Sequence, residues 1–337
     1  MVVLSHSSLS QFLLPNSCMP TNTSSFLNEI PEIDLSDPQA KTLIVKASQD
    51  LGFFKLVNHG VPFDLISNLE TQALNFFALP QPHKDRLGPP DPFGYGNNKI
   101  GPNGDVGWIQ YLLLNINPEV VSPKSLSILQ ENPETFRRAV EEYISAMKNM
   151  SCKVLELMAE GLGLEQRNAF SKLLKDESDC YLRLNYYPPC EELEGMKIEG
   201  KLIGFGEHTD PQIISVLRSN ATSGLQICMK DGTWVSVPPD NTSYFVNIGD
   251  SLQVMTNERF RSVKHRVVPD TSKSRLSMIY FVGPALNEKI RPLPSLMSNQ
   301  EESLYKEFTW YEYKNAGSKT RLSHDRLALF HKSSPSC

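Results

Sequence analysis

The spacing of apolar residues changes from helical to strand-like about halfway along the chain. Apolar positions follow a period near 3.6 over residues 37–50, 62–77 and 133–163, which predicts three amphipathic helices. After Cys180 the period becomes two, and short runs rich in β-branched and aromatic residues are divided by turn residues. This pattern indicates an antiparallel β sandwich or barrel with flanking helices, a mainly β fold class.

The β-rich part of the chain divides into short expected strands. They cover residues 181–187, 202–206, 212–218, 225–228, 233–237, 243–248, 252–256, 264–268 and 275–282. Earlier strands are expected at 30–35, 53–57 and 108–113, whereas residues 88–107 hold too many Gly, Pro and Asn residues for a regular element. The segment from about 300 to 331 is expected to be helical. No βαβ alternation occurs, so a dinucleotide-binding fold is not indicated.

These patterns divide the chain into five parts. They are a disordered N-terminus at 1–26, an N-terminal α/β region at 27–135, a long connecting helix at 136–175, a β core at 176–290 and a C-terminal helical segment and tail at 291–337. The first part is assigned to disorder because it is rich in Ser, Asn and Thr.

Charge and composition exclude some classes of partner. The chain has 337 residues and a formal net charge of −5, so no basic excess is present to hold nucleic acid or an anionic membrane. No run reaches the roughly 18 apolar residues of a membrane span, and the N-terminus lacks the basic start of a signal peptide. A cytoplasmic location without nucleic-acid or membrane partners is expected. The oligomeric state does not follow from the sequence.

The six cysteines show no C-x-x-C spacing. A zinc knuckle or redox dithiol is therefore not indicated, and a reducing compartment fits best. Cys190 follows two prolines and is expected at the surface, where a regulatory or intersubunit thiol is one interpretation.

A histidine and an aspartate two residues apart suggest a metal site. His208 and Asp210 share one face if the segment is a strand, and His265 is the one further histidine in the β region. Two histidines and one carboxylate form a facial triad with three open positions, which suits non-haem Fe(II) and oxygen, whereas zinc is more often closed by a fourth ligand. For His-x-Asp alone, a loop with two surface polar residues is the alternative.

An arginine at the start of a later strand suggests an anion site. Arg275 and Ser277 share a face that continues with apolar Ile279 and Phe281. A buried guanidinium is costly unless it meets an anion. A ligand carboxylate held by Arg275 and Ser277 would meet this need, and an internal salt bridge is the alternative.

Several motifs together match a known family. They are HTD at 208–210, KHRV at 264–267, RLS at 275–277, NYYPPC at 185–190, NIGD at 247–250, GFF at 52–54 and NHG at 58–60. The chain resembles the plant Fe(II)/2-oxoglutarate-dependent dioxygenases from about residue 28 to 331. This resemblance implies a double-stranded β-helix (jelly-roll) core flanked by helices.

Further motifs outside the shared chemistry narrow the resemblance. They are YGN at 95–97, IGPNGDVGW at 100–108, VMTN at 254–257, LNEKI at 286–290 and FTWYEYK at 308–314. They are similar to those of the gibberellin 2-oxidases, most closely the branch that acts on C19 gibberellins. The resemblance implies 2β-hydroxylation of a gibberellin, which inactivates the hormone, with release of succinate and CO2.

The resemblance also implies roles for individual residues. His208, Asp210 and His265 would hold Fe(II), while Arg275, Ser277, Tyr187 and Asn185 would hold 2-oxoglutarate, with O2 as the other reactant and ascorbate as reductant. For the rigid, apolar gibberellin, Lys99, Trp108, Tyr111, Phe245 and Phe281 are expected around the pocket. Core packing is the alternative for each aromatic residue, and a solvated loop position is the alternative for Lys99.

Two positions depart from the family pattern. Glu258 stands where relatives usually have Gly after Asn257, and Lys99 stands where they often have Arg. The second change would remove bidentate pairing with a substrate acid. Two other functions therefore stay open: a related hydroxylase or desaturase acting on another plant metabolite or gibberellin position, and a jelly roll that binds a ligand without catalysis.

Overall fold

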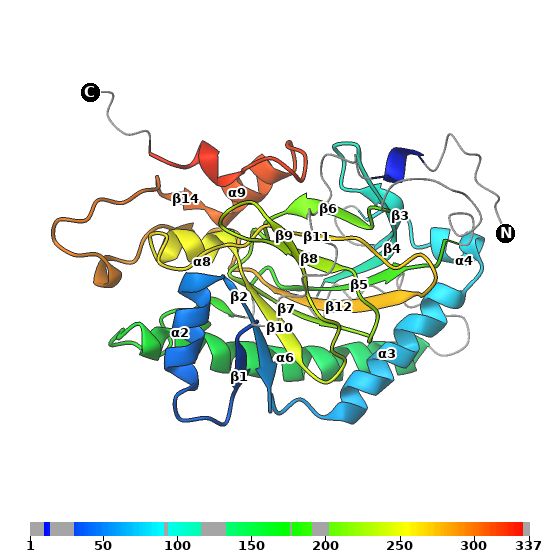
Figure 1. Cartoon of the computed structure of the whole chain (residues 1–337), viewed down its shortest axis with the longest axis horizontal. Coiled ribbons are helices and arrows are strands. Elements are labelled where there is room, and N and C mark those ends of the chain that lie inside the picture. The colour runs from blue at the N-terminus through cyan, green and yellow to red at the C-terminus, as the bar shows by residue number, and fades with distance from the viewer. Residues whose placement is uncertain are drawn as a thin grey trace.

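An eight-stranded sheet is the largest element of the computed structural model, which describes residues 10–13, 30–90, 94–115, 133–175, 177–190 and 202–332 (Figure 1). In spatial order its strands are β1 (Glu32–Asp34), β2 (Phe53–Val57), β10 (Tyr244–Ile248), β7 (Ile214–Ser219), β12 (Arg275–Val282), β5 (Tyr181–Tyr187), β4 (Asp105–Asn115) and β3 (Gly94–Ile100). Only β1 and β2 pair in parallel; the other pairs are antiparallel. Strands from the first 115 residues thus lie at both edges of the sheet.

A four-stranded antiparallel sheet packs against one face of the large sheet. Its strands are β6 (Phe205–His208), β11 (His265–Val267), β8 (Leu225–Cys228) and β9 (Trp234–Ser236), in that spatial order. Phe205, Leu225 and Val267 from this sheet share one apolar cluster with Leu217 and Ile279 of the large sheet. The two sheets form the jelly-roll core with flanking helices that the sequence predicted, so the predicted fold class is confirmed.

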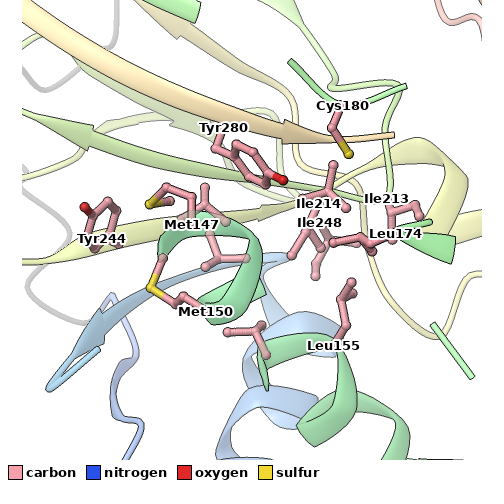
Figure 2. Packing of buried hydrophobic residues seen from close by; sticks show 14 of the residues in the cluster. Met147, Met150, Leu155, Leu174, Cys180, Ile213, Ile214, Tyr244, Ile248 and Tyr280 are labelled. Atoms are coloured by element: carbon pink, nitrogen blue, oxygen red, sulfur yellow. The ribbon is translucent and has the colours of Figure 1, made fainter. Parts of the chain in front are cut away.

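Helices cover the opposite face of the large sheet. They are α2 (Ala40–Asp50), α3 (Phe63–Ala78) and the long α6 (Pro133–Gly161). Side chains alternate along a strand, so one set of strand residues faces the small sheet and the other faces α6. Figure 2 shows Met147, Met150 and Leu155 of α6 beside Ile214 and Tyr280 of the large sheet. The predicted helical periodicity therefore marks the buried side of each helix.

Shorter elements complete the chain. They are the helices α4 (Gln81–Asp85), α8 (Asp250–Met255) and α9 (Trp310–Gly317), the strands β13 (Lys289–Ile290) and β14 (Phe308–Thr309), and the 3-10 turns η1 (Ser10–Phe12), η3 (Ser171–Leu173), η4 (Pro294–Leu296) and η5 (Leu327–Leu329). Among the described residues, none of the helices has the length and apolar character that a bilayer span requires.

Three local predictions from the sequence are wrong. Residues 94–100 form strand β3 because β4 supplies backbone partners, and Gly96 lets the Tyr111 ring lie where a Cβ would come within 2.3 Å of it. Residues 252–256, expected as strand, belong mostly to helix α8, since a short apolar run does not distinguish the two. Of the segment 300–331, α9 is the α-helical part.

The N-terminus is ordered at one point where the sequence predicted disorder. Phe12 is 3% exposed and its ring lies edge-on to Trp108, while Leu13 forms a β-bridge with Leu202. Cys190 is buried in the same cluster, so its expected surface position is also wrong. Both predictions failed because Phe12 and Cys190 are buried by contact with other apolar residues. Residues 1–9 and 14–26, the rest of the segment predicted to be disordered, lie outside the described residues.

The contact between α6 and the large sheet predicts an uneven response to leucine truncation. Leu155 is fully buried on α6, whereas Leu43 on α2 is 37% exposed. Leu155→Ala should lower the free energy of unfolding by about 2–5 kcal/mol, because it leaves a cavity. Leu43→Ala should change it by less than about 1 kcal/mol. Urea unfolding of both variants measures the difference, and equal losses would contradict this packing.

Candidate active site

Two histidines meet where β6 ends and β11 begins. His208 is the last residue of β6 and His265 the first of β11, and the two are direct partners in the antiparallel register. Asp210 follows β6 by two residues. Its Oδ1 lies 3.6 Å from the His208 Nε2 and 3.7 Å from the His265 Nε2. One ligand atom from each residue thus lies within 4.8 Å of the others, close enough to share a metal ion.

Backbone carbonyls determine which nitrogen of each imidazole carries the proton. The His208 Nδ1 lies 2.9 Å from the Gly206 oxygen, and the His265 Nδ1 lies 3.2 Å from the Val263 oxygen. Each Nδ1 therefore carries a proton and donates it to the carbonyl, which leaves the Nε2 lone pair facing Asp210. Burial and the nearby His265 lower the pKa of His208 to about 3, so its neutral, ligating form persists well below neutral pH.

The Asp210 carboxylate is oriented by neighbouring strands. Its Oδ2 accepts hydrogen bonds from the Ser215 hydroxyl at 2.6 Å and the Asn247 amide at 3.2 Å, which leaves Oδ1 for the histidines. Burial alone raises the pKa of Asp210, but the histidines and these hydrogen bonds hold it below its ordinary value. Gly249 lets the loop approach closely, because a Cβ there would meet the Gln212 carbonyl at 1.9 Å.

A buried guanidinium of the large sheet lines the same cavity as the metal ligands. Arg275 is 2% exposed and pairs in register with Tyr187 across β12 and β5. Its Nε and Nη1 and the Tyr187 hydroxyl have no hydrogen-bond partner among the described residues. Burial lowers the pKa of Arg275. Within the described chain no carboxylate lies in ion-pair range of it, whereas the buried Arg218 is paired with Glu70 at 2.9 Å.

These groups line one cavity of about 190 Å³. Its polar wall contains His208, Asp210, His265, Arg275, Ser277, Tyr187 and Asn185, and its apolar wall contains Phe205, Leu217, Leu225, Val267, Ile279 and Phe281. The three metal ligands and the unpaired guanidinium thus face a common space. Two histidines and a carboxylate with open positions suit Fe(II), and the unpaired guanidinium suits an acid bound beside the metal.

Only one of the aromatic residues predicted for the substrate pocket lines this cavity. Phe281 lies on its wall, with its ring 4.8 Å from that of Tyr181. Phe245 is stacked on Phe53 in the core between the sheets, and Tyr111 is buried in the same core. Trp108 packs instead near the N-terminal turn. The alternative of core packing therefore describes these last three, because strand alternation gives the direction of a side chain and not its depth.

Lys99 lies outside the cavity as well. It is exposed on β3, and its backbone oxygen accepts a hydrogen bond from the Tyr111 hydroxyl at 3.1 Å. The side chain is exposed to solvent, as in the alternative interpretation, but the residue lies on a strand and not in a loop. Glu258, the other departure from the family pattern, has φ +66° after Asn257 at φ +48°, and it accepts a hydrogen bond from the Tyr305 hydroxyl at 2.6 Å.

Two arginines at the cavity were missed from the sequence. Arg183 shares a face of β5 with Asn185 and Tyr187, so the same i, i+2 rule could have found it. Its Nε donates to the Asn185 Oδ1 at 2.8 Å, which engages Asn185 with Arg183. Arg326 reaches the cavity from the C-terminal segment together with Leu322, and no spacing in the sequence signals this return.

The fold and the ligand set define a mononuclear non-haem iron oxygenase. The model of the 2OG-Fe(II) oxygenase superfamily matches residues 178–284, and that of the non-haem dioxygenase in morphine synthesis N-terminal matches residues 30–124. The chain belongs to the 2OG-Fe(II) oxygenase superfamily, an oxidoreductase family that uses iron and 2-oxoglutarate.

Relatives and solved structures agree with this assignment. The chain is 65% identical over 334 residues to gibberellin 2-beta-dioxygenase from Phaseolus coccineus, covering 99% of each protein. It is 59% identical over 306 residues to gibberellin 2-beta-dioxygenase 2 from Arabidopsis thaliana, covering 90% of this chain and 89% of the relative. A crystal structure of JOX2 in complex with 2OG, Fe and JA matches with a TM-score of 0.81 at 27% identity, covering 99% and 95% of the two chains.

The hydrogen bond from Ser215 to Asp210 predicts a loss of metal affinity when it is removed. Ser215→Ala should weaken Fe(II) binding about 10- to 100-fold, because the ligating carboxylate loses its orientation. Ser219→Ala, a buried serine on the same strand, is the matched control and should bind Fe(II) like the wild type. Anaerobic Fe(II) titration provides the measurement. Equal affinities in all three proteins would show that this hydrogen bond does not orient the ligand.

Proposed function

We propose that this chain is a gibberellin 2β-dioxygenase that hydroxylates C19 gibberellins at C2 and so inactivates the hormone. The observation that carries this proposal is 65% identity, over nearly the whole chain, to a protein named for that activity. The complete metal triad and the unpaired Arg275 support it, because a jelly roll that had lost catalysis would not need to keep either. The reaction consumes 2-oxoglutarate and O2 and releases succinate and CO2.

The residues of the cavity wall have distinct roles in this proposal. His208, Asp210 and His265 hold Fe(II), and Arg275 with Ser277 and Tyr187 holds the distal carboxylate of 2-oxoglutarate. The bound iron and 2-oxoglutarate supply the oxidising power that inserts an oxygen atom from O2 into a C–H bond. Ascorbate as reductant and a cytoplasmic location stay predictions from the sequence.

The protein contributes orientation and exclusion of water. Leu217, Leu225, Val267, Ile279 and Phe281 give the cavity an apolar wall beside the metal site, which suits a rigid polycyclic substrate. The cavity of about 190 Å³ suits a small acid such as 2-oxoglutarate, whereas ligand pockets for larger molecules usually span roughly 300–1,000 Å³. A gibberellin therefore displaces part of this wall. Leu322 and Arg326 are the side chains that the C-terminal segment contributes to it.

Product analysis tests the reaction directly. The protein incubated with Fe(II), 2-oxoglutarate and a C19 gibberellin should give the 2β-hydroxylated product together with CO2. His208→Ala should abolish both, because the triad loses a ligand. A hydroxyl at another position, or turnover of another plant acid only, would identify one of the related hydroxylases. CO2 release that equals wild type in His208→Ala would remove the proposed role of this histidine.

The unpaired guanidinium predicts opposite effects for two buried arginines. Arg275→Met should weaken 2-oxoglutarate binding about 100-fold, while the ligand-free protein keeps or gains stability because an uncompensated charge is removed. Arg218→Met, which leaves Glu70 without its partner, should lower stability and leave 2-oxoglutarate affinity within about threefold. Calorimetric titration and thermal unfolding measure the two quantities. The reverse pattern would contradict the assignment of Arg275.

A further inference from the structure

The cavity holds two guanidinium groups that the binding of 2-oxoglutarate does not use. Arg183 lies on β5 and pairs in register with Ile279 of β12, whereas Arg275 pairs with Tyr187. Four residues of a strand separate Arg183 from Tyr187, which is roughly 13 Å along the sheet. The backbone positions of the two arginines are thus well separated along the sheet.

Arg183 is held rigidly and lacks an acid. Its guanidinium lies 4.0 Å from the ring centre of Tyr111 and 4.8 Å from that of Phe205, and its Nε donates to Asn185. One terminal nitrogen, Nη2, is buried without a hydrogen-bond partner, and in the described chain no carboxylate lies within ion-pair distance of the group. The two rings and the Asn185 amide orient the planar guanidinium, and its buried Nη2 has no acceptor.

Arg326 approaches from outside the sheets. It belongs to the C-terminal segment, lines the cavity beside Leu322, and likewise has no carboxylate within ion-pair distance in the described part of the chain. Both arginines act on Tyr181: burial raises the pKa of this tyrosine, and the charges of Arg183 and Arg326 oppose the rise. Both guanidinium groups line the same cavity, Arg183 from β5 and Arg326 from the C-terminal segment.

The net charge of the cavity wall stays positive when 2-oxoglutarate is the only bound acid. Three arginines and one aspartate line the wall, leaving two net positive charges. Fe(II) raises this to four, and 2-oxoglutarate, a dianion, lowers it to two. Unpaired charges are costly where they are withdrawn from water: Arg275 is buried, and Arg183 and Arg326 are half-buried. A second anion at the Arg183 end would reduce the imbalance, and the substrate is the remaining molecule that enters during turnover.

We propose that Arg183 and Arg326 bind the carboxylate of the substrate, so that this site selects an apolar monocarboxylic acid at the end of the cavity away from Arg275. The inference rests on the proposed function, in which that acid is a gibberellin. It replaces the earlier expectation that Lys99 meets the acid, because the Lys99 side chain is exposed on β3 and does not line the cavity.

The experiment compares the acid with its neutral methyl ester. Binding of each to the protein loaded with Fe(II) and 2-oxoglutarate is measured without oxygen by calorimetry. Arg183→Met and Arg326→Met should each weaken binding of the acid roughly 10- to 100-fold and that of the ester less than about threefold. Arg183→Lys should recover part of the loss. Affinity for 2-oxoglutarate should stay within about twofold, which also shows that the variants are folded.

The exposed Arg321, on the same segment as Arg326, provides the control for a general loss of charge. Arg321→Met should bind acid and ester like the wild type. Equal losses for acid and ester in Arg183→Met would indicate a packing role and overturn the proposal. So would undiminished acid binding in Arg183→Met, or a loss confined to Lys99→Met. Wild type that neither binds nor hydroxylates a gibberellin would contradict the proposed function and, with it, this inference; the other outcomes contradict the acid site alone.

Discussion

The direct pairing of His208 with His265 is the constraint from which the site follows. The pairing places the two ring centres 4.3 Å apart at the end of the small sheet. Because side chains alternate along a strand, a shift of one residue in either strand would turn one imidazole to the opposite face. Asp210 needs only the turn after β6 to reach both Nε2 atoms. The small sheet therefore supplies the metal ligands, and its packing against the large sheet encloses them.

The interior carries positive charge that the polypeptide does not balance by itself. Arg218 shows how the same fold treats a structural arginine: it is buried, and Glu70 compensates it. Arg275 and Arg183 have no such partner among the described residues, although both contribute to the wall of the cavity. A protein interior tolerates unpaired arginines when bound ligands neutralise their charge. Part of the stability of the loaded protein therefore comes from the carboxylates of its ligands. In the functions proposed above, these unpaired arginines are the groups that bind those acids.

The sequence predicted features that depend on neighbouring residues, and it did not predict those that depend on contacts between distant parts of the chain. Periodicity predicted the β core and the long helix, and the i, i+2 rule placed Arg275 and Ser277 on one wall, because these depend on local geometry. The rule did not reveal that Phe245 lies beside the cavity, stacked on Phe53, since it gives the face of a side chain and not its position along the sheet. Arg326 reaches the cavity through the path of the whole C-terminal segment, which no local pattern encodes.

The C-terminal segment is tied to both sides of the cavity that it closes. The Trp310 indole and the Lys314 ammonium donate to Asp179 just before β5, and the Tyr313 hydroxyl donates to Asp250 beside the metal loop. Further along, the backbone N–H of Leu322 donates to Asp105 at the start of β4. In the proposed function the strands hold the metal and its co-substrate, while the segment that carries Leu322 and Arg326 is anchored by these polar contacts and by the buried Trp310 and Tyr313. Residues on such a segment can change the substrate that is accepted without disturbing the iron chemistry, because they contribute no ligand to the metal.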